Sequence, residues 1–490
     1  MKDVLRAANH GAGLSLWTYR GAKGADLYVK CLQLILRHQL AFLIHKKGLT
    51  TELETVVQDL WTLRISQLGN KIRSESQELG SSQVFSTQES DTEAEDDPLF
   101  LPSRKKKLQE NPTLIDCLAL CYLGTMTLRL PVTPGDIYTW TTEEDMPYSN
   151  AMRLLSPAMK NRLQATHQGA LSPNSLLNLR RFYTSLANIE VGFEMKFSIL
   201  WPPLNVPVLL FRYLKDLALP LELYDAAMKL GEYLGYDFAL HITAKQKLNI
   251  ADLPEAQLMS CLVICVKLIF PFDDTIRHPK SVSEPAATAV NWAEWSKLMQ
   301  EAKAEARGGR LQYTTQELTK LEEKDVFDMS NHQLDQYLDF YLTNFLDDTY
   351  LQPNGAVDDF HAALYDMFPV TAGGAYQRQQ PPTDSQSAMK FQLVRDVHRT
   401  TREVRAIADA DDSRVNRPGV EYVEYKTEKA MPEHARRFYE EAARVAGLSL
   451  HMLVRSVRYL ERKIARQKGR RSAPQSEMPA EVQHEEERQF

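Results

Sequence analysis

Apolar residues recur every three or four positions over long stretches of this chain, which is the spacing of one helix face. The first such stretch runs from Cys31 to Leu43 and ends in a basic turn followed by glycine, Lys46-Lys47-Gly48. The same spacing predicts further helices at residues 51–64, 151–165, 209–217, 291–306, 331–346 and 448–467. A helix start is also predicted at Thr133-Pro134-Gly135-Asp136, which combines an N-cap residue, a first-turn proline and an acid. The pattern is that of an all-α protein.

One helical stretch occurs twice. Leu114, Cys117, Leu118 and Cys121 return 144 positions later as Leu258, Cys261, Leu262 and Cys265. The preceding helix is also repeated, because residues 49–60 align with residues 219–230 at an offset of 170. Each cysteine helix is followed by a proline, at positions 131 and 271. We interpret this as a tandem helical repeat whose first copy carries an insertion between its helices.

The cysteines of the repeat invite a metal hypothesis and a packing hypothesis. Their spacing of four places Cys117 and Cys121 on one helix face, as it does Cys261 and Cys265, and Gly124 extends the first face. Structural zinc sites normally use cysteines two residues apart with a second pair or histidines nearby, and no such partner set is present. Free cysteine packs like a small hydrophobic residue. The sequence therefore predicts that these four cysteines mark the core of each repeat and bind no metal.

The insertion covers residues 66–107. Its middle, residues 74–97, holds eight acidic and no basic residues among many Ser, Thr and Gln, so the whole insertion, residues 66–107, is predicted to be disordered. Ser90 and Thr92 each have an acid three residues later and are candidates for an acid-directed kinase, although a plain solvated loop is the simpler interpretation. The basic run at residues 104–107 fits either a nuclear-import signal, a phosphate contact or simple solubilising charge.

These patterns divide the chain into segments. The predicted organisation is an N-terminal linker remnant at 1–30, a first repeat at 31–168, a second repeat at 169–275, a helical region at 276–371, a linker at 372–387, C-terminal helices with a basic face at 388–472, and an acidic tail at 473–490. The last predicted helix is the most basic, since residues 451–472 contain eight Lys or Arg and one acid. The tail is predicted to be disordered.

Composition changes the picture little. The chain has 490 residues, 43% of them hydrophobic and 25% charged, and a net charge of −6, so nucleic-acid binding would need local basic patches. Five cysteines in apolar contexts favour reduced thiols and an intracellular location. No secretory signal is recognisable, and the most apolar regions are interrupted by prolines or a lysine, so no membrane association is expected.

Motifs of catalysis are missing from the sequence. It contains no phosphate-binding glycine loop, nucleophile elbow or zinc-protease helix. His38 and His45 share a predicted helix face, but no further ligand stands at metal spacing, and the acidic runs 143–145 and 347–348 are better explained as capping or loop charge. We therefore expect a protein that is not an enzyme and carries no cofactor.

The repeats resemble the two cyclin-like repeats of transcription factor IIB and its relatives. More specifically, four ordered segments resemble the fungal IIB-like subunit of the RNA polymerase I core factor: residues 19–23 (YRGAK), 31–37 (CLQLILR), 52–61 (ELETVVQDLW) and 130–138 (LPVTPGDIY). Residues 438–443 and 447–449 add to the resemblance. That family carries an N-terminal zinc ribbon, and no paired cysteines precede Cys31, so neither zinc nor ribbon contacts are carried over.

The resemblance implies a nuclear and nucleolar transcription initiation factor. Such a protein would bridge the ribosomal DNA core promoter, TATA-binding protein, the other core factor subunits and RNA polymerase I. Candidate phosphate contacts are Lys46, Lys47, Arg180, Arg181, Arg212, Lys215, Arg455, Arg458, Arg462 and Arg466. Each of the first six is individually better explained as ordinary surface charge, because isolated basic pairs are common on solvated faces, and the last four could equally dock an acidic protein. The alternatives are a cyclin-type regulatory subunit of a protein kinase, a IIB-like factor for another polymerase, and a generic helical scaffold.

Overall fold

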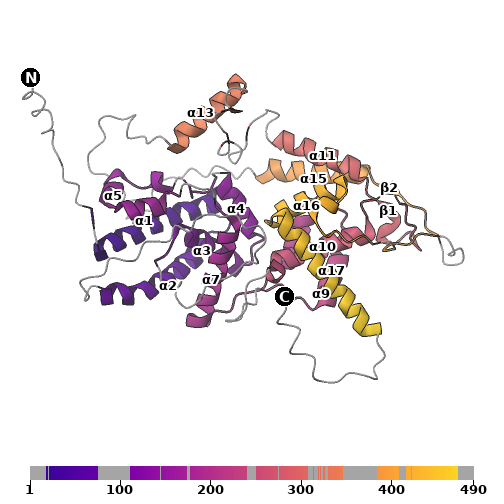
Figure 1. Ribbon diagram of the computed structural model, residues 1–490, viewed down its shortest axis with the longest axis horizontal. Coiled ribbons are helices and arrows are strands. Elements are labelled where there is room, and N and C mark those ends of the chain that lie inside the picture. The colour runs from indigo at the N-terminus through magenta and orange to yellow at the C-terminus, as the bar shows by residue number, and fades with distance from the viewer. Residues whose placement is uncertain are drawn as a thin grey trace, which may run out of the picture. The chain divides into compact units, whose positions relative to one another are not determined.

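The computed structural model describes residues 18–75, 111–306, 329–345, 383–407 and 415–472, apart from short gaps inside these ranges, together with isolated residues between 313 and 325 (Figure 1). Helices dominate the described residues, and a two-residue antiparallel pair, β1 (Thr288–Ala289) with β2 (Arg402–Glu403), is the sheet among them. The chain forms two compact units. The first contains the described residues up to 209 and from 299 to 393, and the second contains 210–240, 250–298 and those from 394 onward.

The first unit is built around one buried helix, α3 (Leu114–Thr127), which packs against three others. These are α1 (Gly21–Ala41), α2 (Glu52–Glu75) and α7 (Leu179–Phe197). The remaining helices are α4 (Pro134–Thr142), α5 (Pro157–Arg162), α6 (Ala165–Leu171) and α13 (Asn331–Phe345), with a π-helical turn at Phe42–Lys46 and a 3₁₀ turn at Ala151–Leu154. The predicted start of α4 is confirmed, since Thr133 and Asp136 form a reciprocal capping box before Pro134.

Asp116 connects three helices of the first unit. Its carboxylate accepts from the Thr113 backbone N–H (3.2 Å) to cap α3, from Arg64 of α2 (3.1 Å) and from the Ser185 hydroxyl of α7 (2.7 Å). Arg64 is only 2% exposed, so its charge depends on this partner. The small face predicted for α3 has a direct role as well. A Cβ on Gly124 would lie 2.4 Å from Val57 Cγ2, so glycine lets α2 approach α3 closely.

Three expectations for the first unit differ from the structure. Residues 21–30, expected to be a linker, are the first turns of α1, where Leu27 and Tyr28 extend the buried face. Residues 66–75 of the expected disordered insertion continue α2. The single helix expected at 151–165 is replaced by a 3₁₀ turn and two short helices, α5 and α6, because Ser156 and Pro157 start a new helix and Leu163 is extended.

Other expectations fall outside the described residues. They concern residues 76–107 of the insertion with Ser90 and Thr92, most of the linker at 372–387, and the tail at 473–490. The last linker residues that are described, 383–387, begin a helix. One stretch among the described residues, Gly21–Lys46, is long and apolar enough to cross a membrane, but 61% of its most apolar window is buried, as in a core helix.

The second unit has the same central arrangement. Its buried helix is α10 (Pro254–Ile269), which packs against α9 (Glu222–Leu234), α16 (Glu433–Ala446) and α17 (Leu450–Ser472). The remaining helices are α8 (Val206–Asp216), α11 (Trp292–Ala306) and α15 (Thr383–Arg399). Each of them has residues in both units, because a boundary between the units falls inside the helix. The helix over 448–467 is therefore confirmed and belongs to the same packed unit as α10, although the sequence placed the two in separate segments.

Buried polar contacts fasten α17 to α10 across the sequence. Lys267 donates to Glu461 at 2.5 Å, and both side chains are 3% exposed. The Tyr422 hydroxyl donates to the same carboxylate, and the Ser260 and Ser456 hydroxyls are 2.9 Å apart. A buried charge without its partner is costly, so these contacts fix how α17 sits on α10.

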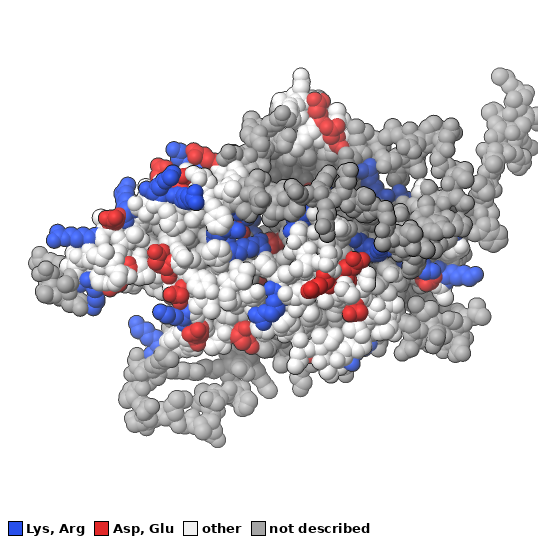
Figure 2. All heavy atoms as spheres, turned by 180° about the vertical axis from the view of Figure 1, so that it is seen from behind, with Lys and Arg blue, Asp and Glu red and all other residues white. Residues whose placement is uncertain are grey.

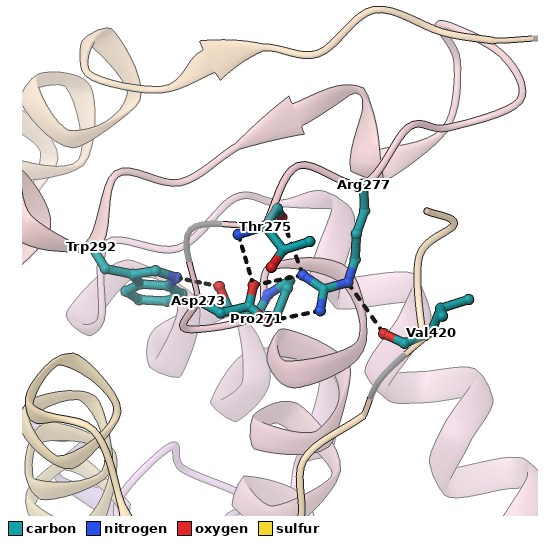
Figure 3. Close-up of polar contacts among 6 residues, drawn as sticks. All are labelled: Pro271, Asp273, Thr275, Arg277, Trp292 and Val420. Carbon is teal, nitrogen blue, oxygen red and sulfur yellow. Dashed lines mark hydrogen bonds and ion pairs between the residues drawn. The ribbon is translucent and has the colours of Figure 1, made fainter. Parts of the chain in front are cut away.

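The chain that leaves α10 is held by a second set of contacts (Figure 3). Arg277 donates to both carboxylate oxygens of Asp273, at 2.6 and 2.8 Å, and to the carbonyl of Val420 at 3.3 Å. Trp292 of α11 donates to the carbonyl of Pro271 at 3.1 Å. The hydrogen bonds from Arg277 lower the pKa of the Asp273 carboxyl. The loop after α10 therefore joins α11 and the C-terminal segment into one unit.

Candidate nucleic-acid interface

Helix α17 separates an apolar face from a basic one. Its buried face contains Leu453, Val457 and Leu460, none more than 2% exposed, which pack in the second unit. The hydrophobic positions recur at helical spacing, so positions between them face solvent. Three arginines there, Arg455, Arg462 and Arg466, are exposed, and Arg458 is half-buried beside them.

An aromatic residue that sequence analysis overlooked completes this row. Tyr459 is 52% exposed and stands four residues after Arg455 and three before Arg462, so all three side chains share one helix face. We call Arg455, Arg458, Tyr459, Arg462 and Arg466 the α17 row. The sequence contained this signal, because Tyr459 is spaced to lie with the arginines and not with the apolar residues of the same helix. An exposed aromatic ring between cations is typical of surfaces that bind single-stranded nucleic acid, where unpaired bases stack on the ring.

The arginines of the α17 row differ from those of the neighbouring helix. On α16, Arg436, Arg437 and Arg444 each bond to a glutamate three or four residues away, with N···O distances of 2.5–3.1 Å. No ion pair recorded for the described part of the chain involves an arginine of the α17 row. The arginines of the α17 row therefore contribute a stronger positive potential at the surface than those of α16, whose charges are offset by glutamates.

Lys46 and Lys47 are placed near aromatic rings of their own unit. Lys47 Nζ lies 3.3 Å from an Asp145 oxygen and 5.1 Å from the centre of the Trp140 ring. Both lysines also lie over Phe42, at 5.9 Å for Lys46 and 5.2 Å for Lys47. The charge of Lys47 is thus already paired with Asp145 and aromatic rings of the same unit, whereas Lys46 is exposed.

The four remaining candidates form two small groups. Arg180 and Arg181 are exposed in the first turn of α7, whose backbone N–H groups are capped by Asn178. Arg212 lies 3.4 Å from Asp216 and is half-buried, as is Lys215. These four residues therefore form two local pairs, one on α7 and one on α8. Figure 2 shows Lys and Arg interspersed with Asp and Glu over the face it presents.

The repeat cysteines lie in the cores of the two units. Cys117, Cys121 and Cys261 are fully buried and Cys265 is 4% exposed. Burial raises the pKa of all four thiols, to about 12 for Cys261 and Cys265. A neutral, buried thiol is a packing residue and a poor metal ligand. Among the residues that the structure describes, no group of three His, Cys, Asp or Glu is arranged to hold a metal ion.

Known proteins match the chain over both repeats. Residues 32–157 match "Rrn7/TAF1B, N-terminal cyclin domain" and residues 175–345 match "Rrn7/TAF1B, C-terminal cyclin domain", which together cover more than half of the chain. The Schizosaccharomyces pombe protein "RNA polymerase I-specific transcription initiation factor rrn7" is 22% identical over 390 residues, 74% of this chain and 70% of that protein. These matches confirm the two tandem cyclin-like repeats predicted from the sequence.

More distant similarities agree. A Rattus norvegicus "TATA box-binding protein-associated factor" of RNA polymerase I is 25% identical over 179 residues, which are 35% of this chain but only 30% of the rat protein. A chain in the crystal structure of the Saccharomyces cerevisiae core factor shares the fold with a TM-score of 0.53 and 14% identity, covering 92% of this chain and 100% of that one. The chain belongs to the Rrn7/TAF1B family of proteins with tandem cyclin domains.

Proposed function

We propose that this protein is a transcription initiation factor of RNA polymerase I and acts as a core factor subunit that bridges the ribosomal DNA core promoter, TATA-binding protein and the polymerase. The observation that carries the proposal is the presence of both family cyclin domains, in order, on one chain. The named S. pombe relative aligns across most of its own length, so the comparison covers more than a shared domain.

The family and its core factor relative support several further assignments. A polymerase I initiation factor works in the nucleus, and the core factor is the complex in which it acts; nucleolar concentration belongs to the proposal. The protein acts by binding and not by catalysis, and it needs no cofactor. A kinase-regulating cyclin is not favoured, because the matching domains are those of an RNA polymerase I factor family.

The α17 row is the surface that best suits promoter DNA. Duplex DNA presents a dense row of phosphates, and arginine pairs with phosphate oxygens through two parallel N–H groups. Lys47 and Arg212 are paired with acids, so we rank them below the row. Phosphate contacts fix position and carry little sequence information, so this helix would hold DNA without reading a specific site.

Promoter occupancy tests the main proposal. The tagged protein should be enriched at the ribosomal DNA core promoter in its own cells and absent from promoters of RNA polymerases II and III. It should also co-purify with the polymerase I initiation machinery. Enrichment at another polymerase's promoters, or a protein kinase as the stable partner, would refute it.

Salt dependence tests the surface. Replacing Arg455, Arg462 and Arg466 with Gln removes three charges, so the log–log salt slope of promoter-duplex binding should fall by about 2.7. The matched control replaces Arg436, Arg437 and Arg444 of α16, three arginines that are paired within their helix. An equal slope for the wild type and the row variant would exclude phosphate contacts by α17.

A further inference from the structure

The arginines of the α17 row are arranged in a way that costs the helix stability. Arg458, Arg462 and Arg466 follow one another at intervals of four residues, and like charges at this interval face each other along a helix and destabilise it. The single acid of α17, Glu461, does not offset them, because it lies in the buried face and bonds to Lys267. A local rule broken in this way indicates a functional surface, and the partner that relieves the repulsion is a polyanion.

Tyr459 stands among these charges with much of its ring in solvent. It is 52% exposed and lies three residues before Arg462. The packing of α17 in the second unit is made by the opposite side of the helix, which includes Val457 and Leu460. Burial therefore does not explain an aromatic side chain at position 459.

A second tyrosine lies at the edge of the row, where α9 ends. The Gly235 backbone N–H donates to the carbonyl of Glu232 at 3.0 Å, and the Tyr236 backbone N–H donates to the carbonyl of Gly231 at 3.1 Å. With Gly235 in the left-handed conformation (φ +68°), these bonds make the Schellman end of a helix. The turn brings the Tyr236 ring against α17, where Lys463 Nζ lies 3.9 Å from the ring centre.

The two tyrosines are neighbours in space. Lys463, which covers the Tyr236 ring, is four residues after Tyr459 and so projects from the next turn of the same side of α17. Burial raises the pKa of Tyr236, and the nearby Cys261 and Tyr459 raise it further. The row, from Arg455 to Arg466, extends over about 16 Å of helix, with one ring exposed within it and a second ring at its edge.

The exposed ring decides which polyanion fits. A duplex keeps the faces of its bases inside the stack, so an arginine row alone is enough to hold its phosphates. Unpaired bases expose a flat face, and proteins hold single strands with basic surfaces in which aromatic rings stack on the bases. An acidic protein segment would pair with the arginines, but its carboxylates offer no flat surface for Tyr459. The combination therefore favours a nucleic-acid strand whose bases are unpaired.

We propose that the α17 row, with Tyr459 as its stacking ring and Tyr236 and Lys463 at its edge, binds unpaired bases and so favours promoter DNA with separated strands over intact duplex. This rests on the proposed function and specifies the form of DNA that the surface takes. The arginines hold the backbone while the Tyr459 ring stacks on a base. Stacking depends little on sequence, which agrees with a surface that holds DNA without reading a specific site.

The test measures how tightly the full chain binds two probes made from the ribosomal DNA core promoter, an intact duplex and the same duplex with a mismatched bubble. The wild type should bind the bubble at least about fivefold more tightly, the effect of one stacked base. Tyr459→Ala should abolish this preference and leave duplex binding unchanged, whereas Tyr459→Phe, which keeps a ring, should retain it. Because stacking involves no charge, Tyr459→Ala should also leave the salt slope of bubble binding unchanged.

A matched control and a crosslink keep the test specific. Phe211→Ala removes a ring that is 46% exposed in the same unit, beside Arg212, whose guanidinium lies 3.4 Å from Asp216, and it should bind both probes as the wild type does. The unfolding temperature of Tyr459→Ala should equal that of the wild type, because the ring is exposed. In the unaltered chain, a photoreactive 5-iododeoxyuridine in the bubble should crosslink to Tyr459.

The outcomes separate the inference from the proposal beneath it. If the full chain binds neither probe, the assignment of DNA to the α17 row and the present inference both fall, while promoter occupancy in cells still decides the initiation-factor role. If it binds duplex and bubble equally, or if Tyr459→Ala keeps the preference, only the stacking inference falls. An equal loss in Phe211→Ala, a crosslink that maps away from α17, or tighter binding of a single-stranded RNA of the same sequence would also overturn it.

Discussion

Removing one member of the buried Lys267–Glu461 pair should unfold the second unit far more easily. In Lys267→Met, the Glu461 carboxylate remains buried, and among the residues that the structure describes only the Tyr422 hydroxyl still donates a hydrogen bond to it. Breaking a buried ion pair by removing one partner costs about 3–5 kcal/mol. Burial already lowers the pKa of Lys267 against the opposing effect of Glu461, so the site disfavours charge.

Replacing the whole set should recover most of that loss. Lys267→Met with Glu461→Leu removes both charges, and Tyr422→Phe removes the hydroxyl that would lose its acceptor. Apolar replacement of a complete buried pair is often neutral or stabilising. The triple variant should therefore unfold within about 1 kcal/mol of the wild type.

Urea unfolding followed by tryptophan fluorescence measures these values, because Trp292 and Trp295 lie in the second unit. The surface pair Arg436–Glu440, with both side chains about half exposed, is the control, and Arg436→Gln should cost less than about 1 kcal/mol. A Lys267→Met cost below about 1 kcal/mol would refute the argument that the pair is essential once buried. A triple variant as unstable as the single one would refute the compensation.

Three further predictions can be checked by the same unfolding measurement. In Gly124→Ala the added methyl group meets Val57, which should destabilise the first unit by about 1–3 kcal/mol, offset by up to about 1 kcal/mol of gained helix propensity. Adding Val57→Ala should restore stability. If the double variant instead lost the sum of the two single losses, the close contact would not be the cause. Cys121→Ser should cost about 1–3 kcal/mol by burying a hydroxyl, while a zinc assay of both proteins should show no metal released; a difference in zinc content would contradict the packing role. The folded pKa of Asp273 lies below its ordinary value of 3.8, so the ionised carboxylate stabilises the fold fully above pH 3.8 and loses this effect as the pH falls further. Asp273→Asn should therefore reduce the free energy of unfolding at pH 6 and change it little at pH 2. An equal effect at both pH values would reject the role of the Arg277 contact.

Local signals explain what the sequence could predict. The capping residues at Thr133 and Asp136 and the apolar spacing of the cysteine helices are contained in a few neighbouring positions, and the structure confirms them. The duplicated cysteines located both central helices because a core helix tolerates small, apolar residues where neighbours approach closely. The start of α1 was missed because glycines in its first turns lower helix propensity, which burial of Leu27 and Tyr28 overrides.

Pairs of residues that are far apart in the chain could not be predicted from the sequence. Lys267 and Glu461 are separated by 194 residues, and nothing near either residue indicates the other. For the candidate interface, the sequence identified the arginines of α17 as candidates. It could not show that Lys47 forms an ion pair with Asp145 and so differs from basic residues that have no such partner. Pairing of a surface charge depends on neighbours from other helices, and a single sequence does not specify them.

The distance between α10 and its covering helices also has a consequence for synthesis. The face of α10 that receives α17 is made long before α17 itself, since Lys267 and Glu461 are 194 residues apart. At roughly 5–20 residues per second, the ribosome takes about 10–40 s to close that interval. Throughout it, the side of α10 that receives α17 stays uncovered in the nascent chain, so production of this protein should depend on chaperones that hold α10 until the last helix emerges.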